Sequence, residues 1–164
     1  MPSSRSRTIR VGAAGIIVQD GKILLVKFDG QRGVHYQFPG GGHTEGETLR
    51  QTAAREVKEE TDADVEVGRL LVTGEAAPFA IDYTYGSTHF LKLFFECTLK
   101  PGSVPRLPDE PDPDEIAVEW IPIAELENLI VIPDISQELI SVLANNGSIF
   151  VEDKARASRE LDKK

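Results

Sequence analysis

The stretch GGHTEGETLRQTAAREVKEETDA, residues 41–63, joins a glycine run to a segment with strong helix signals. Thr48 can cap the first turn, and Gln51 completes a Thr-x-x-Gln capping box with it. These signals predict a helix over Leu49–Thr61. Asp62 follows where a left-handed residue is common, and Asp tolerates that conformation better than most residues.

The expected helix carries an unusual concentration of acid. At about 100° per residue, Glu56, Glu59 and Glu60 fall within an arc of about 100°, beside an arc of apolar residues that can pack. Like charges at this spacing repel, so either the acidic face is simply solvated or a cation belongs there. Carboxylate oxygens suit Mg²⁺ or Mn²⁺. The glycines before the helix can let a backbone carbonyl approach the same ion.

Arg55 interrupts the acidic run. Its guanidinium can pair with Glu59 one turn on or reach back to Glu47. We favour the second partner because a guanidinium can hold a carboxylate in a fixed orientation through two parallel hydrogen bonds.

The rest of the chain alternates β-rich runs with a few helical ones. An Asp-Gly pair between two apolar runs predicts an N-terminal hairpin. The expected strands are Val11–Val18, Lys22–Phe28, His35–Phe38, Val65–Thr73, His89–Leu99 and Ile116–Ile121. Pro101–Asp114 is rich in proline and acid and predicts an irregular surface loop.

Two further helices are expected near the C-terminal end. The first covers Ile123–Leu129, and the second begins at a cap formed by Asp134 or Ser136 and ends near residues 145–147. Ile149–Val151 then pairs or packs. Because strands and helices are interspersed irregularly, the pattern favours an α+β fold with a mixed sheet between helices.

Composition narrows the class of protein. The 164 residues fit one domain at 11–151, with a flexible N-terminus at 1–10 and a charged tail at 152–164. A net charge of -9 argues against binding a nucleic acid polymer. The sequence has no membrane span and no signal peptide, which predicts a cytoplasmic protein. Cys97 lies in an apolar run and is interpreted as a structural thiol.

The spacing of charged residues in the opening stretch closely resembles the Nudix box of Nudix hydrolases, G-x5-E-x7-R-E-U-x-E-E-x-G-U, in which U is a bulky aliphatic residue. All charged positions match, and the box ends with two departures, Asp62 for glycine and Ala63 for the aliphatic residue. Tyr36–Gly42 resembles the family's lead-in to the box. Glu119–Pro122 resembles its late Trp-x-Pro segment. The matching positions are Gly41, Glu47, Arg55, Glu56, Val57, Glu59 and Glu60.

The resemblance implies a Nudix-like α/β/α sandwich with a mixed β-sheet between helices. It implies a Mg²⁺-dependent (or Mn²⁺-dependent) nucleotide pyrophosphatase that cleaves a nucleoside diphosphate linked to another moiety, such as ADP-ribose, a nucleotide sugar or a modified nucleoside triphosphate. By the same resemblance, Glu56, Glu59, Glu60 and Gly41 would bind metal, while Glu47 and Arg55 would orient them. One carboxylate would act as general base, and the sequence does not decide which. Asp112, Asp114 and Glu115 are either a further acid or a solvated loop.

The expected partner is a small-molecule nucleotide, and whether the chain forms a homodimer is left open. Phe79, Tyr83 and Tyr85 lie in one expected loop, where they can stack on a base or fill the edge of the core. Two other functions compete with hydrolysis: a noncatalytic nucleotide-sensing Nudix domain and a merely structural acidic helix. Retention of every carboxylate of the box favours the enzyme.

Overall fold

A tight hairpin starts the fold. The chain turns at Asp20 and Gly21, whose φ angles of 52° and 73° suit the twist between β1 (Arg10–Gln19) and β2 (Lys22–Gly30). The computed structural model describes residues 8–77 and 88–152. Within them the expected hairpin is confirmed.

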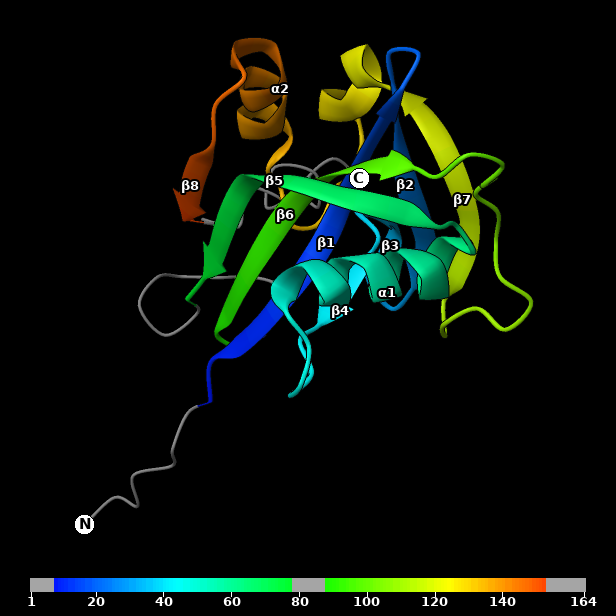
Figure 1. Cartoon of the computed structure of the whole chain (residues 1–164), viewed down its shortest axis with the longest axis horizontal. Coiled ribbons are helices and arrows are strands. Elements are labelled where there is room, and N and C mark those ends of the chain that lie inside the picture. The colour runs from blue at the N-terminus through cyan, green and yellow to red at the C-terminus, as the bar shows by residue number, and fades with distance from the viewer. Residues whose placement is uncertain (1–7, 78–87, 153–164) are drawn as a thin grey trace.

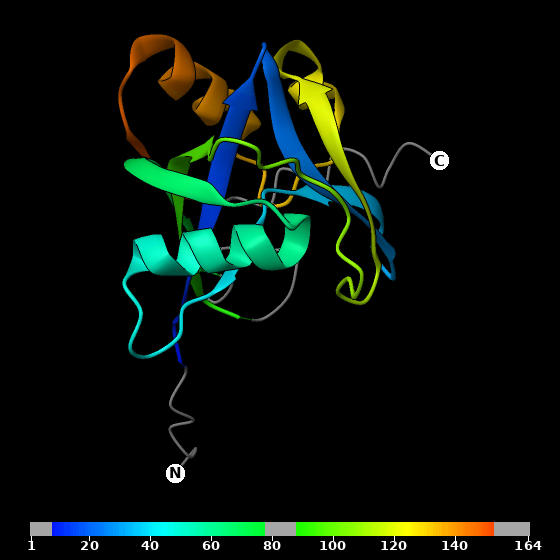
Figure 2. The same cartoon turned by 45° about the vertical axis from the view of Figure 1, so that its right-hand side comes forward.

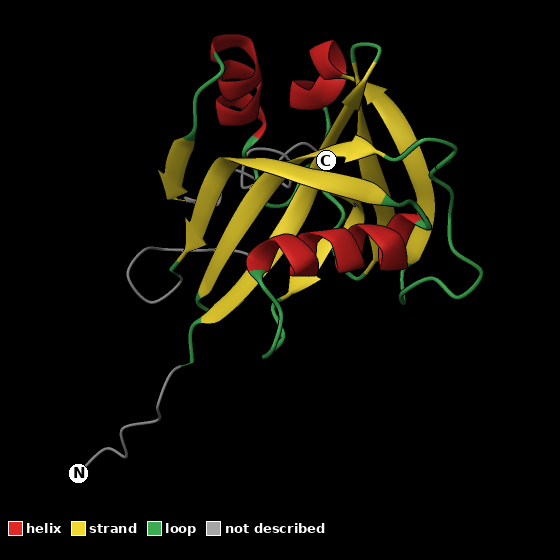
Figure 3. Ribbon diagram, viewed as in Figure 1, coloured by secondary structure: helices red, strands yellow, loops and turns green. Residues whose placement is uncertain are grey.

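The eight strands of the described residues form one mixed sheet (Figures 1 and 3). Its main path runs β3-β2-β1-β6-β5-β8, while β4 pairs with β1 and β7 pairs with β2. The pairs β1 with β6 and β5 with β8 are parallel, and the other pairs are antiparallel. The remaining strands are β3 (Gly33–Gln37), β4 (Gly40–Gly42), β5 (Val65–Ala76), β6 (Phe90–Leu99), β7 (Glu115–Pro122) and β8 (Ile149–Glu152).

Helices cover both faces of this sheet (Figure 2). On one face, Ala53 and Val57 of α1 (Leu49–Thr61) pack in a buried cluster with Ile17 and Phe95. On the other face lie η1 (Ile123–Asn128) and α2 (Ser136–Asn145), with Leu126 and Leu139 buried in a second cluster. The α/β/α arrangement around a mixed sheet is thereby confirmed.

Helix α1 begins and ends where the sequence predicts. Thr48 Oγ1 accepts from the backbone N–H of Gln51 at 3.2 Å, and the Gln51 side chain accepts from the backbone N–H of Thr48 at 2.8 Å. At the other end Asp62 takes a left-handed conformation with φ 53°. Its neighbour Ala63 is fully buried, which leaves room only for a small side chain. These caps fix the direction in which α1 presents its glutamates.

One expectation about the C-terminal half is wrong. Neither Asp134 nor Ser136 caps α2, because the cap residue is Ile135 and no side chain caps the helix. Ser136 is already helical, and Asp134 lies one residue too early. The helix over Ile123–Asn128 forms, but as a 3₁₀ helix. The glycine run Gly40–Gly42 forms the strand β4 because it pairs with β1.

Cys97 is buried within the α1 cluster, and burial raises the pKa of its thiol to about 12. The thiol therefore stays protonated at neutral pH, as expected for a structural cysteine. None of the helices in the described residues is long and apolar enough to cross a membrane.

Candidate active site

Arg55 is the centre of the site. Its Nε donates to Glu47 Oε1 at 2.5 Å and its Nη2 donates to Glu47 Oε2 at 3.0 Å, which makes the two-point pair expected from the sequence. The Arg55 hydrogen bonds, with the one from Thr52, lower the pKa of Glu47 to about 2. Glu47 is therefore a fixed carboxylate anion at neutral pH.

The same guanidinium reaches three further groups. Arg55 Nη1 lies 2.7 Å from Glu56 Oε1 and 3.3 Å from Glu59 Oε2, and Nη2 donates to the Gly42 carbonyl at 3.1 Å. Both partners that the sequence offered to Arg55 are thus used. Because one side chain binds β4 and two glutamates of α1, Arg55 ties the glycine strand to the acidic face of the helix.

A hydrogen-bond relay from His43 through Thr52 also orients Glu47. Thr52 is fully buried, and its Oγ1 lies 2.8 Å from Glu47 Oε2 and 2.7 Å from His43 Nδ1. A hydroxyl has one proton, and Glu47 Oε2 lies closer to it than its other acceptor, the Thr48 carbonyl at 3.3 Å, so Thr52 donates to Glu47 and His43 Nδ1 donates to Thr52. The orientation of Glu47 is therefore set from two sides.

Glu56 lies directly against the glycine strand. A Cβ built on Gly41 would come 2.5 Å from Glu56 Oε2, so only glycine permits this approach. Burial raises the pKa of Glu56, and the ion pair with Arg55 opposes that rise. The site thus holds a half-desolvated carboxylate against the backbone of β4.

Glu60 is more deeply buried. Its Oε2 accepts from the Gly40 backbone N–H at 3.4 Å. Burial raises the pKa of Glu60 to about 8, while the nearby Lys92 opposes the rise and the carboxylates of Glu115 and Glu56 add to it. Burial also lowers the pKa of Lys92, and the carboxylates of Glu60 and Glu56 oppose that lowering. An additional positive charge would stabilise the ionised form of this group.

Of the acids Asp112, Asp114 and Glu115, the one that turns inward is Glu115, the first residue of β7. It is buried, accepts from the Asp112 backbone N–H at 3.1 Å through Oε2, and has no hydrogen-bond partner for Oε1 among the described residues. Burial raises its pKa. Asp112 and Asp114 are exposed. Glu115 is therefore the one of the three acids that faces Glu60.

The three expected metal ligands do not converge in this structure. Glu56 and Glu60 are largely buried, whereas the side chain of Glu59 is 57% exposed and turned toward Arg55. Within residues 8–77 and 88–152, no group of three or more His, Cys, Asp and Glu side chains is arranged to hold a metal ion. The proposed base-stacking residues Phe79, Tyr83 and Tyr85 lie outside the described residues.

Three residues of the site were not predicted from the sequence. His43 and Thr52 sit inside the motif at positions for which it specifies no residue, so spacing alone does not single them out. Lys92 is distant in sequence and reaches the site because β6 pairs with β1 opposite Gly12. A lysine within an apolar strand was the signal available for it.

The mixed sheet between helices and the carboxylates gathered around Arg55 define a Nudix-type domain. The model of the NUDIX domain matches residues 7–143, and the chain belongs to the Nudix family. Nudix hydrolase 2 of Arabidopsis thaliana is 32% identical over 134 residues, which are 78% of this chain. The match spans 44% of the length of that relative.

Solved structures agree on the fold. A NUDIX hydrolase from Nitrosomonas europaea has a TM-score of 0.69 at 20% identity, covering 86% of this chain and 92% of that chain. An ADP-ribose pyrophosphatase from Streptococcus suis has a TM-score of 0.61 at 21% identity, covering 88% and 98%. At these identities the likeness establishes the shared fold.

Proposed function

We propose that this chain hydrolyses a phosphoanhydride bond in a nucleoside diphosphate linked to another moiety. ADP-ribose, a nucleotide sugar or a modified nucleoside triphosphate fits this description. The observation that carries the proposal is the contact of Arg55 with Glu47, Glu56, Glu59 and the Gly42 carbonyl. A merely structural acidic face has no need of a buried relay that orients one of its carboxylates.

The residues of the site have the donor chemistry of a divalent metal site, although the three glutamates do not converge in this structure. Their donors are the oxygen atoms that Mg²⁺ and Mn²⁺ prefer. Gly41 lets the Glu56 carboxylate approach β4 so closely that any other residue there would displace it. Glu56, Glu59 and Glu60, with the carbonyl of Gly41, would hold the ion. When bound, it would neutralise phosphate charge and favour an activated water.

The protein would supply orientation and a base. A water oxygen forms a bond to one phosphorus, the bridging P–O bond breaks, and a carboxylate accepts the proton of the water. Glu115 is buried, lies near Glu60 and has no hydrogen-bond partner for Oε1 among the described residues, so it is suited to take up that proton. Glu47 is unsuited, because its pKa of about 2 makes it a weak base. Its role is to hold Arg55.

Turnover of a nucleotide panel with and without Mg²⁺ tests the proposal. Substrates are ADP-ribose, nucleotide sugars and oxidised nucleoside triphosphates, and the readout is release of nucleoside monophosphate or phosphate. Glu59→Gln and Glu60→Gln should each lower turnover by at least about 100-fold, because each removes a carboxylate that would hold the metal ion beside the phosphates. Glu66→Gln, an exposed change on β5, is the matched control.

Near-normal activity of the Glu59 and Glu60 variants would remove these residues from the mechanism. Tight binding of a nucleotide without turnover, by a folded wild-type protein supplied with Mg²⁺, would instead favour the nucleotide-sensing domain.

A further inference from the structure

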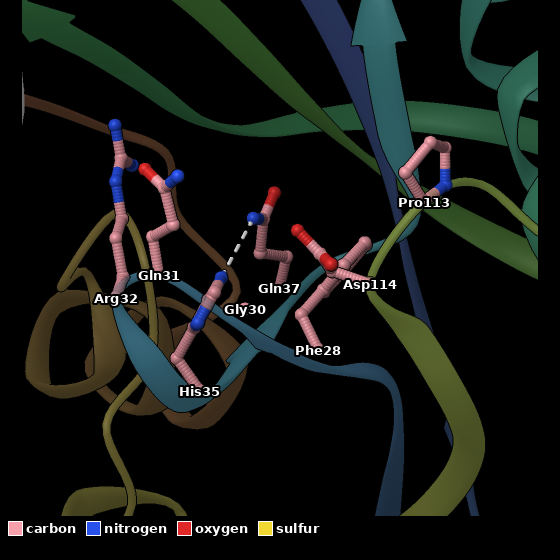
Figure 4. A pocket seen from close by; sticks show the side chains of 8 residues that line it. All are labelled: Phe28, Gly30, Gln31, Arg32, His35, Gln37, Pro113 and Asp114. Carbon is pink, nitrogen blue, oxygen red and sulfur yellow. Dashed lines mark hydrogen bonds between the residues drawn. The ribbon is translucent and has the colours of Figure 1, made fainter.

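A pocket of about 300 Å³ opens beside the turn between β2 and β3 (Figure 4). Its walls include Phe28 of β2, His35 and Gln37 of β3, and Asp114 just before β7. The volume lies at the small end of small-molecule sites, which suits one ring system of a larger ligand. None of these residues belongs to the Nudix motif.

The pocket lies on the same face of the sheet as α1. Val26 pairs with Gln37 on one side and with Val118 on the other, and residues directly opposite each other point to one face. Val118 packs against the α1 cluster. Phe28 and His35 follow the same alternation, two residues away from Val26 and Gln37 along their strands. The pocket and the glutamates of α1 therefore share one side of the molecule.

The pocket is also close to the carboxylates along the chain. Asp114 immediately precedes Glu115, the buried acid that faces Glu60. Gln37 lies three residues before Gly40, whose N–H donates to Glu60. A ligand whose diphosphate lies at the glutamates can thus extend its next group into the pocket.

Hydrogen bonds fix the orientation of the Gln37 side-chain amide in the pocket. His35 Nδ1 lies 2.9 Å from the Gly33 carbonyl, which can only accept, so Nδ1 carries the proton. In the neutral ring Nε2 is then an acceptor for Gln37 Nε2 at 3.2 Å. Figure 4 shows the amide nitrogen of Gln37 directed at the ring and its oxygen directed away. Gln37 therefore offers a carbonyl acceptor and one remaining N–H to a ligand.

Asp114 is held in place by its backbone. Its φ of 69° is left-handed, and its carbonyl accepts from the Asp29 N–H at 2.8 Å. Non-glycine residues seldom adopt this conformation, and Asp and Asn adopt it more readily than others. Gly30 lies so close to the carboxylate that any side chain there would collide with it. The backbone thus holds an acceptor-only carboxylate at the pocket.

Gln31, Arg32 and Pro113 also line the pocket, and one further part of its wall is flat. The rings of Phe28 and His35 are stacked, with centroids 5.5 Å apart and an interplanar angle of 14°. A planar ring adds naturally to such a stack. The pocket therefore combines a flat wall with two oxygen acceptors from Gln37 and Asp114.

We propose that this pocket binds the nucleobase of the substrate and favours bases with an exocyclic amino group, adenine, guanine or cytosine, over uracil. The inference rests on the proposed hydrolase function. An amino group donates to the carboxylate of Asp114, as carboxylates accept from cytosine N4 in other settings. Uracil has a carbonyl in place of that amino group, and its oxygen would face the carboxylate without a proton between them.

The test uses ADP-glucose, GDP-glucose and UDP-glucose, which share one sugar and differ in the base. The full-length wild-type protein should show a kcat/KM about tenfold or more lower for UDP-glucose. Asp114→Asn should cut this preference by about tenfold, because the amide can donate to uracil O4. Asn also tolerates the left-handed backbone, so the fold is kept.

Asp29→Asn is the matched control. It makes the same change one residue from Phe28, on an exposed side chain that points to the other face of the sheet. It should leave the base preference unaltered. Gly30→Ala is a second variant, expected to weaken the preference by displacing the Asp114 carboxylate.

The results separate this inference from the proposed function. Hydrolysis with no base preference, or with a preference that Asp114→Asn leaves unchanged, overturns the inference while the function stands. Loss of the preference in Phe79→Ala or Tyr83→Ala, with Asp114→Asn normal, also overturns it by moving the base to that segment.

If no sugar nucleotide is hydrolysed, the proposed activity fails for this substrate class. The proposal for the pocket is then tested by measuring the binding of nucleotides. Calorimetry with AMP, GMP, CMP and UMP should then show weakest binding for UMP, with the difference removed by Asp114→Asn. Equal affinity for all four nucleotides, or no binding of any, overturns the inference.

Discussion

Thr52 and Glu47 are joined by a hydrogen bond of 2.8 Å between Oγ1 and Oε2, made from a side chain with no solvent exposure. Thr52 lies in the first turn of α1, and Glu47 lies in the loop just before the helix. The Nudix motif specifies no residue at the position of Thr52. Thr52 nevertheless orients the Glu47 carboxylate, and Glu47 pairs with Arg55.

Removing the Thr52 hydroxyl should therefore loosen the site. We expect Thr52→Val, which keeps the shape, to lower turnover by about tenfold, as loss of an outer-shell partner does. It should also lower the free energy of unfolding by about 1–2 kcal/mol, because His43 and Glu47 each lose a partner. Thr52→Ser keeps the hydroxyl and should restore most of the activity. Equal turnover in both variants would show that the relay has no catalytic role.

Glu47 should contribute an acid-dependent part of the stability. Its pKa is lowered from 4.5 to about 2, so its contribution is present above about pH 4.5 and is lost as the pH falls toward 2. Urea unfolding of wild type and Glu47→Gln should show a stability difference that is constant from pH 7 to 5 and shrinks below pH 4.5. A difference that stays constant down to pH 2.5 would contradict the fixed Glu47 anion.

Glu60 should have the opposite effect. Burial raises its pKa from 4.5 to about 8, so the folded state prefers the neutral acid. The resulting stabilisation is present below about pH 4.5 and is lost as the pH rises through 8. In EDTA, Glu60→Gln should thus gain stability relative to wild type between pH 5 and 8.5, measured by urea unfolding. Glu66→Gln should show no such trend, because Glu66 is exposed.

The departure of Asp62 from the motif's glycine has a local compensation. Its left-handed conformation is unfavourable for a residue with a Cβ, but its carboxylate pairs with Lys58 at 3.1 Å and Arg106 at 2.7 Å. Asp62→Ala keeps the backbone cost and loses both pairs, whereas Asp62→Gly loses the pairs and relieves the cost. Thermal unfolding should rank Asp62→Ala below both Asp62→Gly and wild type. An alanine variant as stable as wild type would contradict this account.

Much of the fold was readable from local chemistry. The Asp-Gly turn, the capping box at Thr48 and Gln51, and the bounds of α1 depend on neighbouring residues only, and the structure confirms each of them. The cap of α2 was not readable in this way. Ile135 takes that position although it has no capping side chain, so propensity pointed to the wrong residues.

The residues of the site were also predictable only where local sequence places them. The pairing of Arg55 with Glu47 follows from the order of residues across one loop and one helix, and the sequence alone predicted it. The positions of Lys92 and Glu115 depend on which strands lie beside β1 and β2, since β6 brings one residue and β7 the other.

The sequence by itself determined the helix, its caps and the set of acids along it, because these depend on contacts within a few residues. Only the tertiary structure decided which acids are buried and where the Asp114 pocket forms. Those properties depend on desolvation and on side chains brought together by long-range strand pairing. Neither can be predicted from a local sequence pattern.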